Sequence, residues 1–308
     1  MPARHDARGD GDGWVECHLG HRHWGRFGAA GVLLHRPLDD VDTGDSSREN
    51  VLLQHRAEWS HHGGTWGLPG GARASTETPV AAALREAKEE ADVPGDRVRV
   101  DATYVDDHGG WSYTTVLAAT TQPVEVRATG GESIDVAWHP ADTLDSLELH
   151  PGFAATWPHL RTALSRLTVV VDAANVVGSR PDGWWRDRAG AAGRLLRAAL
   201  PLAAGGVAGS RLPAGTAPDL DRWWPDVVVV LEGAARAADP LGPAGGLRVV
   251  HAPASGDDTI VSVTEAAATA GPVLVVTADR GLRDRVTAVG AGVAGPRWWH
   301  DLVDGQDR

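Results

Sequence analysis

Hydrophobic and polar positions follow two different patterns along the chain, one before and one after about residue 165. In the first part, apolar-rich stretches predict strands at four places: residues 27–36, 50–56, 98–105 and 112–119. A polar, turn-rich loop separates the first two strands at residues 37–50. A further strand is predicted at residues 124–128 and a closing helix at residues 147–160. This part should combine several strands with flanking helices.

In the second part, the apolar positions form continuous runs rich in valine. The runs occupy residues 166–172, 226–232, 247–251 and 272–279. Runs that do not alternate with polar residues indicate strands buried on both faces, as in a parallel sheet. Helical stretches lie between them, at residues 189–200, 259–270 and 281–289. The alternation of strand and helix predicts a three-layer α/β domain with a mostly parallel sheet.

The length of 308 residues suggests two domains, which the patterns place at residues 26–165 and 166–308. Residues 1–25 are charged and rich in His and Gly, so they are predicted to be a flexible tail without a signal peptide. No apolar run is long enough to span a bilayer, so no membrane contact is expected. Cys17 is the only cysteine, which excludes an intrachain disulfide and favours a reducing, cytoplasmic location.

Charge is distributed unevenly between the two parts. The net charge is -12, and residues 1–165 carry 14 basic and 25 acidic side chains against 15 and 16 in residues 166–308. An acidic protein binds nucleic acid poorly without specific contacts, because attraction to phosphate dominates such binding. Any contact with RNA should therefore be local and lie on the second part of the chain.

One stretch of the first part carries candidate chemistry, namely the helix predicted over residues 80–91. It is free of Gly and Pro, and Thr78 can cap it. Glu86, Glu89 and Glu90 are spaced to share one helical face. Three carboxylates crowded together repel one another unless a cation lies between them, and their oxygens suit Mg²⁺ or Mn²⁺. The Gly-rich loop before the helix could add the Gly70 carbonyl as a ligand.

This stretch resembles the Nudix box, a signature with fixed spacing. The matching residues are Gly71, Glu77, Arg85, Glu86, Glu89 and Glu90. The lead-in at residues 66–71, Trp-x-Leu-Pro-Gly-Gly, is also common in that family. Ala87 and Asp92 depart from the signature, which has a larger aliphatic and a Gly there. Because Asp tolerates a left-handed backbone, we expect a slightly altered helix exit and an intact metal site.

The resemblance covers about residues 25–165 and implies a Nudix α/β/α sandwich with a mixed sheet. It implies hydrolysis of a nucleoside diphosphate linked to another group, with Mg²⁺ or Mn²⁺ held by Glu86, Glu89 and Glu90. It also implies that Glu132, in a loop before a later strand, completes the metal site or acts as the general base. The general base could be either Glu132 or Glu89. Arg85 and Glu77 should pair. The lead-in and residues 149–153 most resemble housecleaning enzymes that act on nucleoside triphosphates, including oxidised ones.

Acidic residues follow the predicted strands of the second part, where functional groups of parallel sheets gather. The set comprises Asp172, Asn175, Glu232, Asp257, Asp258 and Asp279. It resembles the PIN-like nucleases, in particular the NYN branch, although Ala173 stands where their first motif has Gly. The resemblance implies phosphodiester hydrolysis assisted by Mg²⁺ or Mn²⁺. The alternative is that Asp257, Asp258 and Asp279 simply cap helices.

Other polar and aromatic residues leave alternatives open. The His61–His62 pair could bind a transition metal, but without a partner at ligand spacing it is expected to be merely exposed. Arginines and tryptophan pairs of the second part could contact RNA, although packing accounts better for most of the tryptophans. Three functions remain: a pyrophosphohydrolase with an accessory domain, a bifunctional enzyme that also cuts RNA, and a nucleotide sensor. The oligomeric state stays open.

Overall fold

The computed structural model describes residues 9–37, 49–238 and 245–305. The chain divides into two compact units, Met1–Leu164 and Ser165–Arg308. The predicted division lies between residues 165 and 166, next to this boundary. Within the described ranges, no helix is both long enough and apolar enough to cross a membrane.

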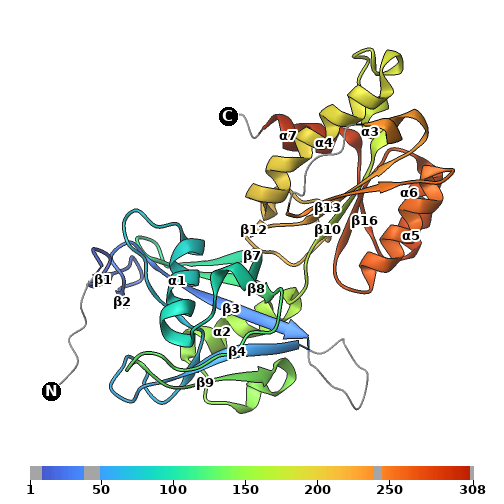
Figure 1. Ribbon diagram of the computed structural model, residues 1–308. Coiled ribbons are helices and arrows are strands. Elements are labelled where there is room, and N and C mark those ends of the chain that lie inside the picture. Colours follow the sequence, from blue (N-terminus) through green and yellow to red (C-terminus); the bar gives the residue numbers. More distant parts are fainter. Residues whose placement is uncertain (1–8, 38–48, 239–244, 306–308) are drawn as a thin grey trace, which may run out of the picture. The chain divides into compact units, whose positions relative to one another are not determined.

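The N-terminal unit is built on a mixed sheet, as the sequence predicts (Figure 1). Strand β3 pairs in parallel with β8, whereas the pairs β3–β4, β3–β6, β4–β5, β4–β9 and β7–β8 are antiparallel. The strands are β3 (Ala29–Pro37), β4 (Glu49–Arg56), β5 (Trp66–Gly67), β6 (Gly70–Ala72), β7 (Val98–Asp107), β8 (Ser112–Thr120) and β9 (Ser133–Pro140).

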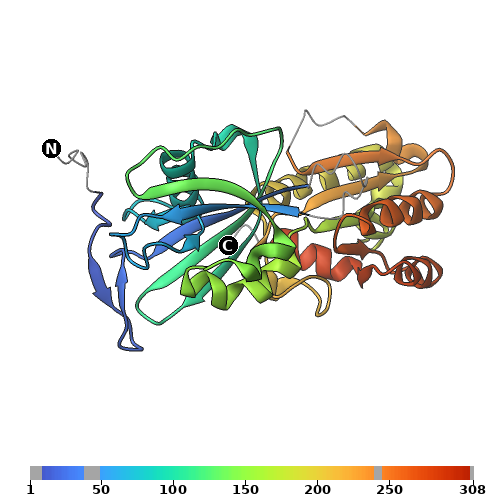
Figure 2. The same ribbon diagram turned by 90° about the horizontal axis from the view of Figure 1, so that it is seen from below.

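Helices α1 (Pro79–Ala91) and α2 (Pro151–Leu160) lie on opposite faces of this sheet (Figures 1 and 2). The face of α1 toward the sheet consists of fully buried alanines, so the helix can approach the strands closely. Ala87, where the Nudix signature has a larger aliphatic, is one of these. Short 3₁₀ helices η1 (Gly95–Arg97), η2 (Ala141–Ser146) and η3 (Arg161–Ala163) complete the unit.

The predicted flexible tail is wrong for residues 9–25, and residues 1–8 lie outside the described residues. Strands β1 (Trp14–Glu16) and β2 (Arg22–Trp24) form an antiparallel hairpin. Before the hairpin, the Asp10 carboxylate accepts a hydrogen bond of 3.0 Å from the backbone N–H of Ser75. Composition suggested disorder, but contacts with distant residues order the segment.

Two further expectations in this unit are corrected. Residues 124–128 form no strand, because the Arg127 N–H donates to the Ala91 carbonyl at the end of α1 instead of to a neighbouring strand. Helix α2 begins at Pro151 and not at residue 147. The residues just before α2 form backbone hydrogen bonds with Trp66, whose N–H donates to the Glu148 carbonyl. Most of the predicted polar loop, residues 38–48, lies outside the described part.

The C-terminal unit has an all-parallel sheet with the strand order β14-β13-β10-β15-β16, which confirms the predicted parallel α/β domain. Helices α3, α4 and α7 cover one face, and α5 and α6 the other (Figure 1). The strands are β10 (Thr168–Asp172), β13 (Asp226–Leu231), β14 (Leu247–His251), β15 (Val273–Val276) and β16 (Gly292–Ala294). The helices are α3 (Ala173–Gly178), α4 (Arg188–Gly205), α5 (Gly256–Ala268), α6 (Arg280–Ala288) and α7 (Pro296–Asp304).

Smaller elements connect these layers. Strands β11 (Val207–Ala208) and β12 (Arg222–Trp223) form a short antiparallel pair. The 3₁₀ helices are η4 (Trp184–Arg186), η5 (Gly209–Arg211) and η6 (Gly233–Ala237).

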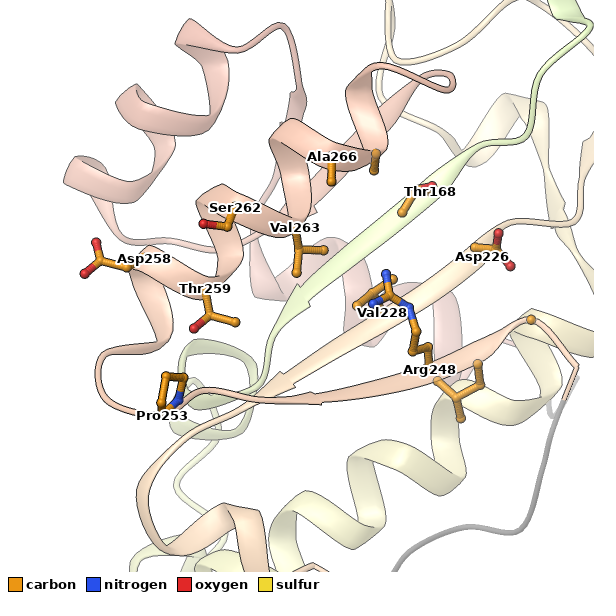
Figure 3. Close-up of a pocket in the computed structure, with 13 residues that line it drawn as sticks. Thr168, Asp226, Val228, Arg248, Pro253, Asp258, Thr259, Ser262, Val263 and Ala266 are labelled. Carbon is orange, nitrogen blue, oxygen red and sulfur yellow. The ribbon is translucent and has the colours of Figure 1, made fainter. Parts of the chain in front are cut away.

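Figure 3 shows a hollow between α5 and strands β10, β13 and β14, with Asp258 in the first turn of α5 pointing away from the strands.

Candidate active site

Both ends of helix α1 are fixed by local contacts that the sequence anticipates. At the start, the Thr78 hydroxyl accepts a hydrogen bond of 3.1 Å from the Ala81 N–H. At the end, Asp92 adopts a left-handed conformation with φ 57°, and its N–H donates to the Ala87 and Lys88 carbonyls. The Asp92 carboxylate also pairs with Arg127 at 2.8 Å. Asp92 therefore ends the helix in the backbone conformation that Gly would adopt.

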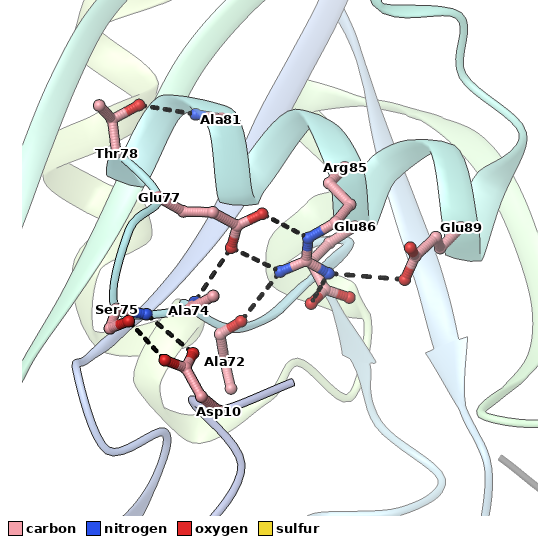
Figure 4. Close-up of polar contacts among 10 residues, drawn as sticks. All are labelled: Asp10, Ala72, Ala74, Ser75, Glu77, Thr78, Ala81, Arg85, Glu86 and Glu89. Carbon is pink, nitrogen blue, oxygen red and sulfur yellow. Dashed lines mark hydrogen bonds and ion pairs between the residues drawn. The ribbon is translucent and has the colours of Figure 1, made fainter. Parts of the chain in front are cut away.

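The expected pair between Glu77 and Arg85 is present and joins the loop to the helix (Figure 4). Arg85 donates to both carboxylate oxygens of Glu77, at 2.8 and 3.0 Å, and to the Ala72 carbonyl at 3.0 Å. The same guanidinium reaches Glu86 at 2.7 Å. Hydrogen bonding from Arg85 lowers the pKa of Glu77, so this carboxylate stays ionised and holds the loop.

Glu86 and Glu90 are buried carboxylates at the centre of the loop and helix. Glu90 is 8% exposed, and its Oε2 accepts a hydrogen bond of 2.8 Å from the Gly70 N–H. Burial, reinforced by the charge of Glu86, raises the pKa of Glu90 to about 8. Burial also raises the pKa of Glu86, although Arg85 opposes the shift. Because both carboxyls resist ionisation, the donor set fits a hard divalent cation that would compensate their charges.

Glu89 and Glu132 lie at the edges of this group. The Glu89 side chain is 62% exposed and reaches Arg85 at 3.5 Å. Glu132 precedes β9 as expected and lies close enough to raise the pKa of both Glu86 and Glu90. A Cβ on Gly71 would come within 2.6 Å of the Glu86 carboxylate, which explains the Gly at this point of the loop.

These carboxylates do not converge on one point. Among the described residues, the groups whose ligand atoms all lie within 4.8 Å of one another are two histidine-containing clusters, and neither includes an acid of α1. The reason is that Arg85 holds Glu86 and reaches Glu89, whereas the Gly70 N–H holds Glu90. The contact found for Gly70 is thus through its N–H, whereas the sequence suggested its carbonyl.

A cavity of about 680 Å³ opens beside the Gly-rich loop. Its wall includes Glu132 and the backbone of Gly70, and Arg56 supplies a positive charge. Sequence reasoning missed most of the side chains in its lining: Trp14, His21, Arg22, His23, Trp24, Arg56, Trp59, Asp106, His108, Trp111, Tyr113 and His150. Arg56 was detectable at the end of a predicted strand, and the density of His and Trp in the supposed tail was a second signal.

Tyr113 reaches the floor of this cavity from β8. Its side chain is half-buried, and burial raises the pKa of its hydroxyl, with the charge of Glu90 adding to the shift. A Cβ on Gly31 would overlap the Tyr113 hydroxyl, at 2.0 Å, so Gly31 in β3 makes room for the tyrosine. The hydroxyl therefore stays protonated and can donate a hydrogen bond at this position.

His61 and His62 have a partner that the sequence did not reveal. His150, at the start of α2, joins them in one of the two clusters with ligand atoms within 4.8 Å. The expectation that the pair lacks a partner is therefore wrong, because the contact of β5 with residues 148–150 brings the third histidine close. Burial lowers the pKa of His150 to about 4, and its Nδ1 caps α2 by accepting from the Gly152 N–H at 3.2 Å.

In the C-terminal unit, Asp172 and Asn175 are fixed at the carboxyl edge of the sheet. Asp172 is 6% exposed and accepts hydrogen bonds from the Asn175 N–H at 3.0 Å and the Thr277 hydroxyl at 2.9 Å. Asn175 Oδ1 accepts from the Ala278 N–H at 3.0 Å, which ties the start of α3 to the residues after β15. Burial raises the pKa of Asp172, and the charges of Asp257 and Glu232 add to the shift.

The other acids of this edge have different roles. Asp279 caps α6, accepting from the Leu282 N–H at 2.8 Å. The cap of α5 is Ser255, so the alternative that Asp257 and Asp258 cap that helix is wrong. Burial raises the pKa of Asp257, with Asp279 nearby, whereas Asp258 is 79% exposed and pairs with Arg285 at 2.7 Å. The edge thus brings Asp172, Asp257 and Asp279 near one another and leaves Asp258 outside.

The arginines and tryptophans of this unit are mostly engaged within it. Trp223 and Trp299 are buried, whereas Trp185 is 53% exposed. Arg194 lies 3.4 Å from Asp182, and Arg180 pairs with Asp304. The burial of Trp223 and Trp299 agrees with packing as the role of these two tryptophans.

Comparisons with known proteins identify relatives of part of the chain. The NUDIX domain family model matches residues 41–160. "Putative 8-oxo-dGTP diphosphatase 3" from Mycobacterium tuberculosis is 49% identical over 162 residues, which cover 51% of this chain and 71% of the relative. A "Nucleoside triphosphate pyrophosphatase/Nudix hydrolase fusion protein" from Bifidobacterium longum is 40% identical over 169 residues, 54% of this chain and 34% of the relative. The solved structure of a Nudix hydrolase from M. smegmatis, RenU, is 47% identical with a TM-score of 0.45, over 49% of this chain and 93% of that one.

Proposed function

This chain belongs to the Nudix family, and we propose that its N-terminal unit is a Mg²⁺-dependent nucleoside triphosphate pyrophosphohydrolase of the housecleaning kind. As a Nudix protein it is a hydrolase acting on phosphorus anhydride bonds. The substrate, the ion and the residue roles are the parts proposed. The observation that supports them is the buried pair of carboxylates Glu86 and Glu90. Arg85 holds Glu86 and the Gly70 N–H holds Glu90, beside a cavity lined by aromatic and cationic side chains.

Each residue of the loop and helix has a role in this proposal. When bound, the divalent cation neutralises the diphosphate and lowers the pKa of a coordinated water. Glu86 and Glu90 hold the ion, with Glu89 at the exposed edge. Glu132 accepts the proton from the attacking water, because it lines the cavity whereas Glu89 is absent from the described lining. Arg85 and Glu77 are positioning residues that keep the loop against the helix.

The cavity suits a nucleoside triphosphate. Arg56 lies near the carboxylates, where its planar guanidinium can bind phosphate oxygens. Trp14, Trp24 and Trp111 offer flat apolar faces on which a base can stack. An oxidised purine triphosphate is the substrate that we favour, since a relative 49% identical is named for 8-oxo-dGTP.

The test compares wild type with Glu90→Gln in Mg²⁺ on ordinary and oxidised nucleoside triphosphates, ADP-ribose and dinucleoside polyphosphates. We expect wild type to release pyrophosphate from a triphosphate and Glu90→Gln to lose at least about a hundredfold in kcat, since a metal ligand is neutralised. Glu125→Gln, an exposed Glu→Gln change, is the matched control and should keep full activity. Turnover of ADP-ribose alone would contradict the substrate class, and turnover of nothing would favour the sensor alternative.

For the C-terminal unit we propose a PIN-like fold with a metal-dependent ribonuclease site at Asp172, Asn175, Asp257 and Asp279. The observation that favours it is the buried Asp172, which two hydrogen bonds aim at the edge where Asp257 also lies. The substitution Asp172→Asn would keep the size and shape of this side chain and remove the charge of one proposed metal ligand. The Mg²⁺ or Mn²⁺ required for phosphodiester hydrolysis would bind these acids.

Single-stranded RNA incubated with the full chain and Mn²⁺ provides the test. We expect cleavage that Asp172→Asn abolishes and that Asp258→Asn retains, because the Asp258 side chain is exposed and paired with Arg285. No cleavage by wild type, or equal cleavage by Asp172→Asn, would remove the nuclease from the proposed function.

A further inference from the structure

The N-terminal hairpin brings together a set of metal-ligating side chains that the proposed hydrolysis does not use. Cys17, His21, His23 and His108 each offer one ligand atom, and these atoms all lie within 4.8 Å of one another. One thiol with three imidazoles is a ligand set typical of transition metals, and unlike that of the hard-cation site at Glu86 and Glu90.

The hairpin explains how three of these residues face one way. Cys17 lies opposite His21, and its N–H donates to the His21 carbonyl at 2.9 Å. Side chains alternate between the two faces of a strand, so His21 and His23 in and beside β2 lie on the same face. Trp14 and Trp24 are paired on the other face, with ring centroids 5.6 Å apart.

The fourth residue comes from the turn between β7 and β8. A backbone hydrogen bond of 2.8 Å from the His18 N–H to the Gly109 carbonyl joins this turn to the hairpin. The ring of His108 lies 4.7 Å from that of His23. Trp111 stacks on the His23 ring, with the ring centroids 3.9 Å apart and the planes nearly parallel, so the ring orientation of His23 is fixed.

The surroundings of the two ring nitrogens of His108 also point to a bound ion. Its Nε2 lies 3.1 Å from the Asp106 carboxylate, which leaves Nδ1 as the nitrogen available to a metal. That Nδ1 is buried and, among the described residues, has no hydrogen-bond partner. A buried polar nitrogen without a partner is costly, and an ion would supply one. A carboxylate behind a histidine is the usual outer contact of a zinc-bound imidazole.

The spacing is close to that of a tetrahedral zinc site. Zinc bond lengths of about 2.3 Å to sulfur and 2.0 Å to nitrogen place neighbouring ligand atoms roughly 3.3–3.6 Å apart. Cys17 Sγ and a His23 ring nitrogen already lie 3.3 Å apart. The other ligand atoms lie within 4.8 Å of one another, so reaching this separation requires shifts of at most about 1.5 Å.

We propose that Cys17, His21, His23 and His108 bind a structural Zn²⁺ that fastens the hairpin to the β7–β8 turn at the wall of the cavity. Binding releases the thiol proton of Cys17, so the sulfur coordinates as thiolate. The site does not depend on the proposed reaction, since none of its ligands belongs to the loop or helix of the Nudix box. It would order the segment whose composition suggests disorder.

The experiment titrates Co²⁺ into the full chain, purified under reducing conditions, stripped with chelator and kept in excess Mg²⁺ so that the carboxylate site holds a hard ion. We expect one equivalent to give a thiolate-to-cobalt charge-transfer band and tetrahedral visible bands, which Zn²⁺ then removes. Cys17→Ser should lose the charge-transfer band, and Asp106→Asn should weaken binding about 10–100-fold. His18→Ala, in the turn between β1 and β2 but outside the cluster, is the matched control and should bind normally.

Two outcomes would overturn the proposal. One is the absence of a sulfur-derived band in wild type, and the other is a band unchanged in Cys17→Ser. Cobalt bound without sulfur and lost in His150→Ala would place the ion at His61, His62 and His150 instead. If Cys17→Ser does not fold, X-ray absorption of the zinc-loaded wild type decides the matter, since one sulfur and three nitrogens are expected around the ion.

Discussion

At the scale of single residues, the N-terminal site concentrates unfavourable charge in the folded chain. Glu90 is buried and lies beside Glu86, and the Gly70 N–H donates a hydrogen bond to its carboxylate. An enclosed carboxylate beside another is stable only if it is protonated or paired with a cation. The residues proposed to bind a divalent ion therefore should also make the metal-free protein sensitive to pH.

The first prediction concerns stability without metal. The pKa of Glu90 is about 8 in the folded chain and 4.5 ordinarily. Between these values the folded state holds a proton that the unfolded chain has released, so the free energy of unfolding falls as pH rises. In chelator, urea unfolding should show a loss on the order of a few kcal/mol between pH 5 and 8.5.

Glu90→Gln should remove most of this pH dependence, because its side chain is neutral throughout. Mg²⁺ should restore the stability of wild type at high pH and leave that of Glu90→Gln unchanged. Glu125→Gln serves as control for the substitution itself, since Glu125 is exposed. A wild type whose stability in chelator is constant or rises over this range would show that Glu90 is ionised in the folded state without metal.

At the scale of elements, the loop and α1 are held at both ends by contacts within a short stretch of chain. Thr78 caps the start, Arg85 ties the loop to the helix, and Asp92 turns the chain out. Asp92 and His62 are the non-Gly residues with positive φ among those described. The family signature has Gly at this exit, so Asp92 adopts the left-handed backbone at the position where the signature avoids a side chain.

Asp92 provides a prediction about this exit. Asp92→Gly should keep the turn, because Gly adopts φ 57° freely and only partly exposed ion pairs are lost. Asp92→Ala should lower Tm by roughly 2–4 °C relative to Asp92→Gly, because Ala tolerates this backbone poorly. Thermal unfolding of both variants measures the difference, and exposed Asp96→Ala controls for loss of a carboxylate. Equal Tm values for the Gly and Ala variants would show that the exit relaxes to another conformation.

At the scale of the whole molecule, two units carry two separate sets of acids. The mixed sheet of the N-terminal unit presents Glu86 and Glu90 from a helix, whereas the parallel sheet of the C-terminal unit presents Asp172 at a strand end. Each unit has its own core of buried aliphatic residues. The two proposed activities are therefore expected to respond to different substitutions.

A crossed experiment tests this separation. Glu90→Gln should abolish triphosphate hydrolysis and leave the cleavage of RNA unchanged, and Asp172→Asn should do the reverse. Both activities are measured on the same preparations of the full chain, with circular dichroism to confirm folding. If Asp172→Asn altered the KM for the triphosphate severalfold, the two units would be coupled, as the sensor alternative requires.

The sequence by itself determined the features that depend on spacing along one segment. Helix α1, its cap at Thr78 and the shared face of Glu86, Glu89 and Glu90 follow from helical periodicity. The runs of valine likewise predicted the parallel sheet, because strands buried on both faces need no polar side chain. The pair of Glu77 with Arg85 was foreseen from the family signature.

Only the tertiary structure decided the features that join distant segments. The order of residues 9–25 depends on Ser75 and on the β7–β8 turn, and neither is visible from a charged, Gly-rich composition. In the same way His150 meets His62, and His108 meets Cys17, across gaps that no local periodicity encodes. Spacing specifies which side chains share a face of one element. Which faces then meet is determined by packing of the whole unit, so the metal-ligating histidines emerge only from the fold.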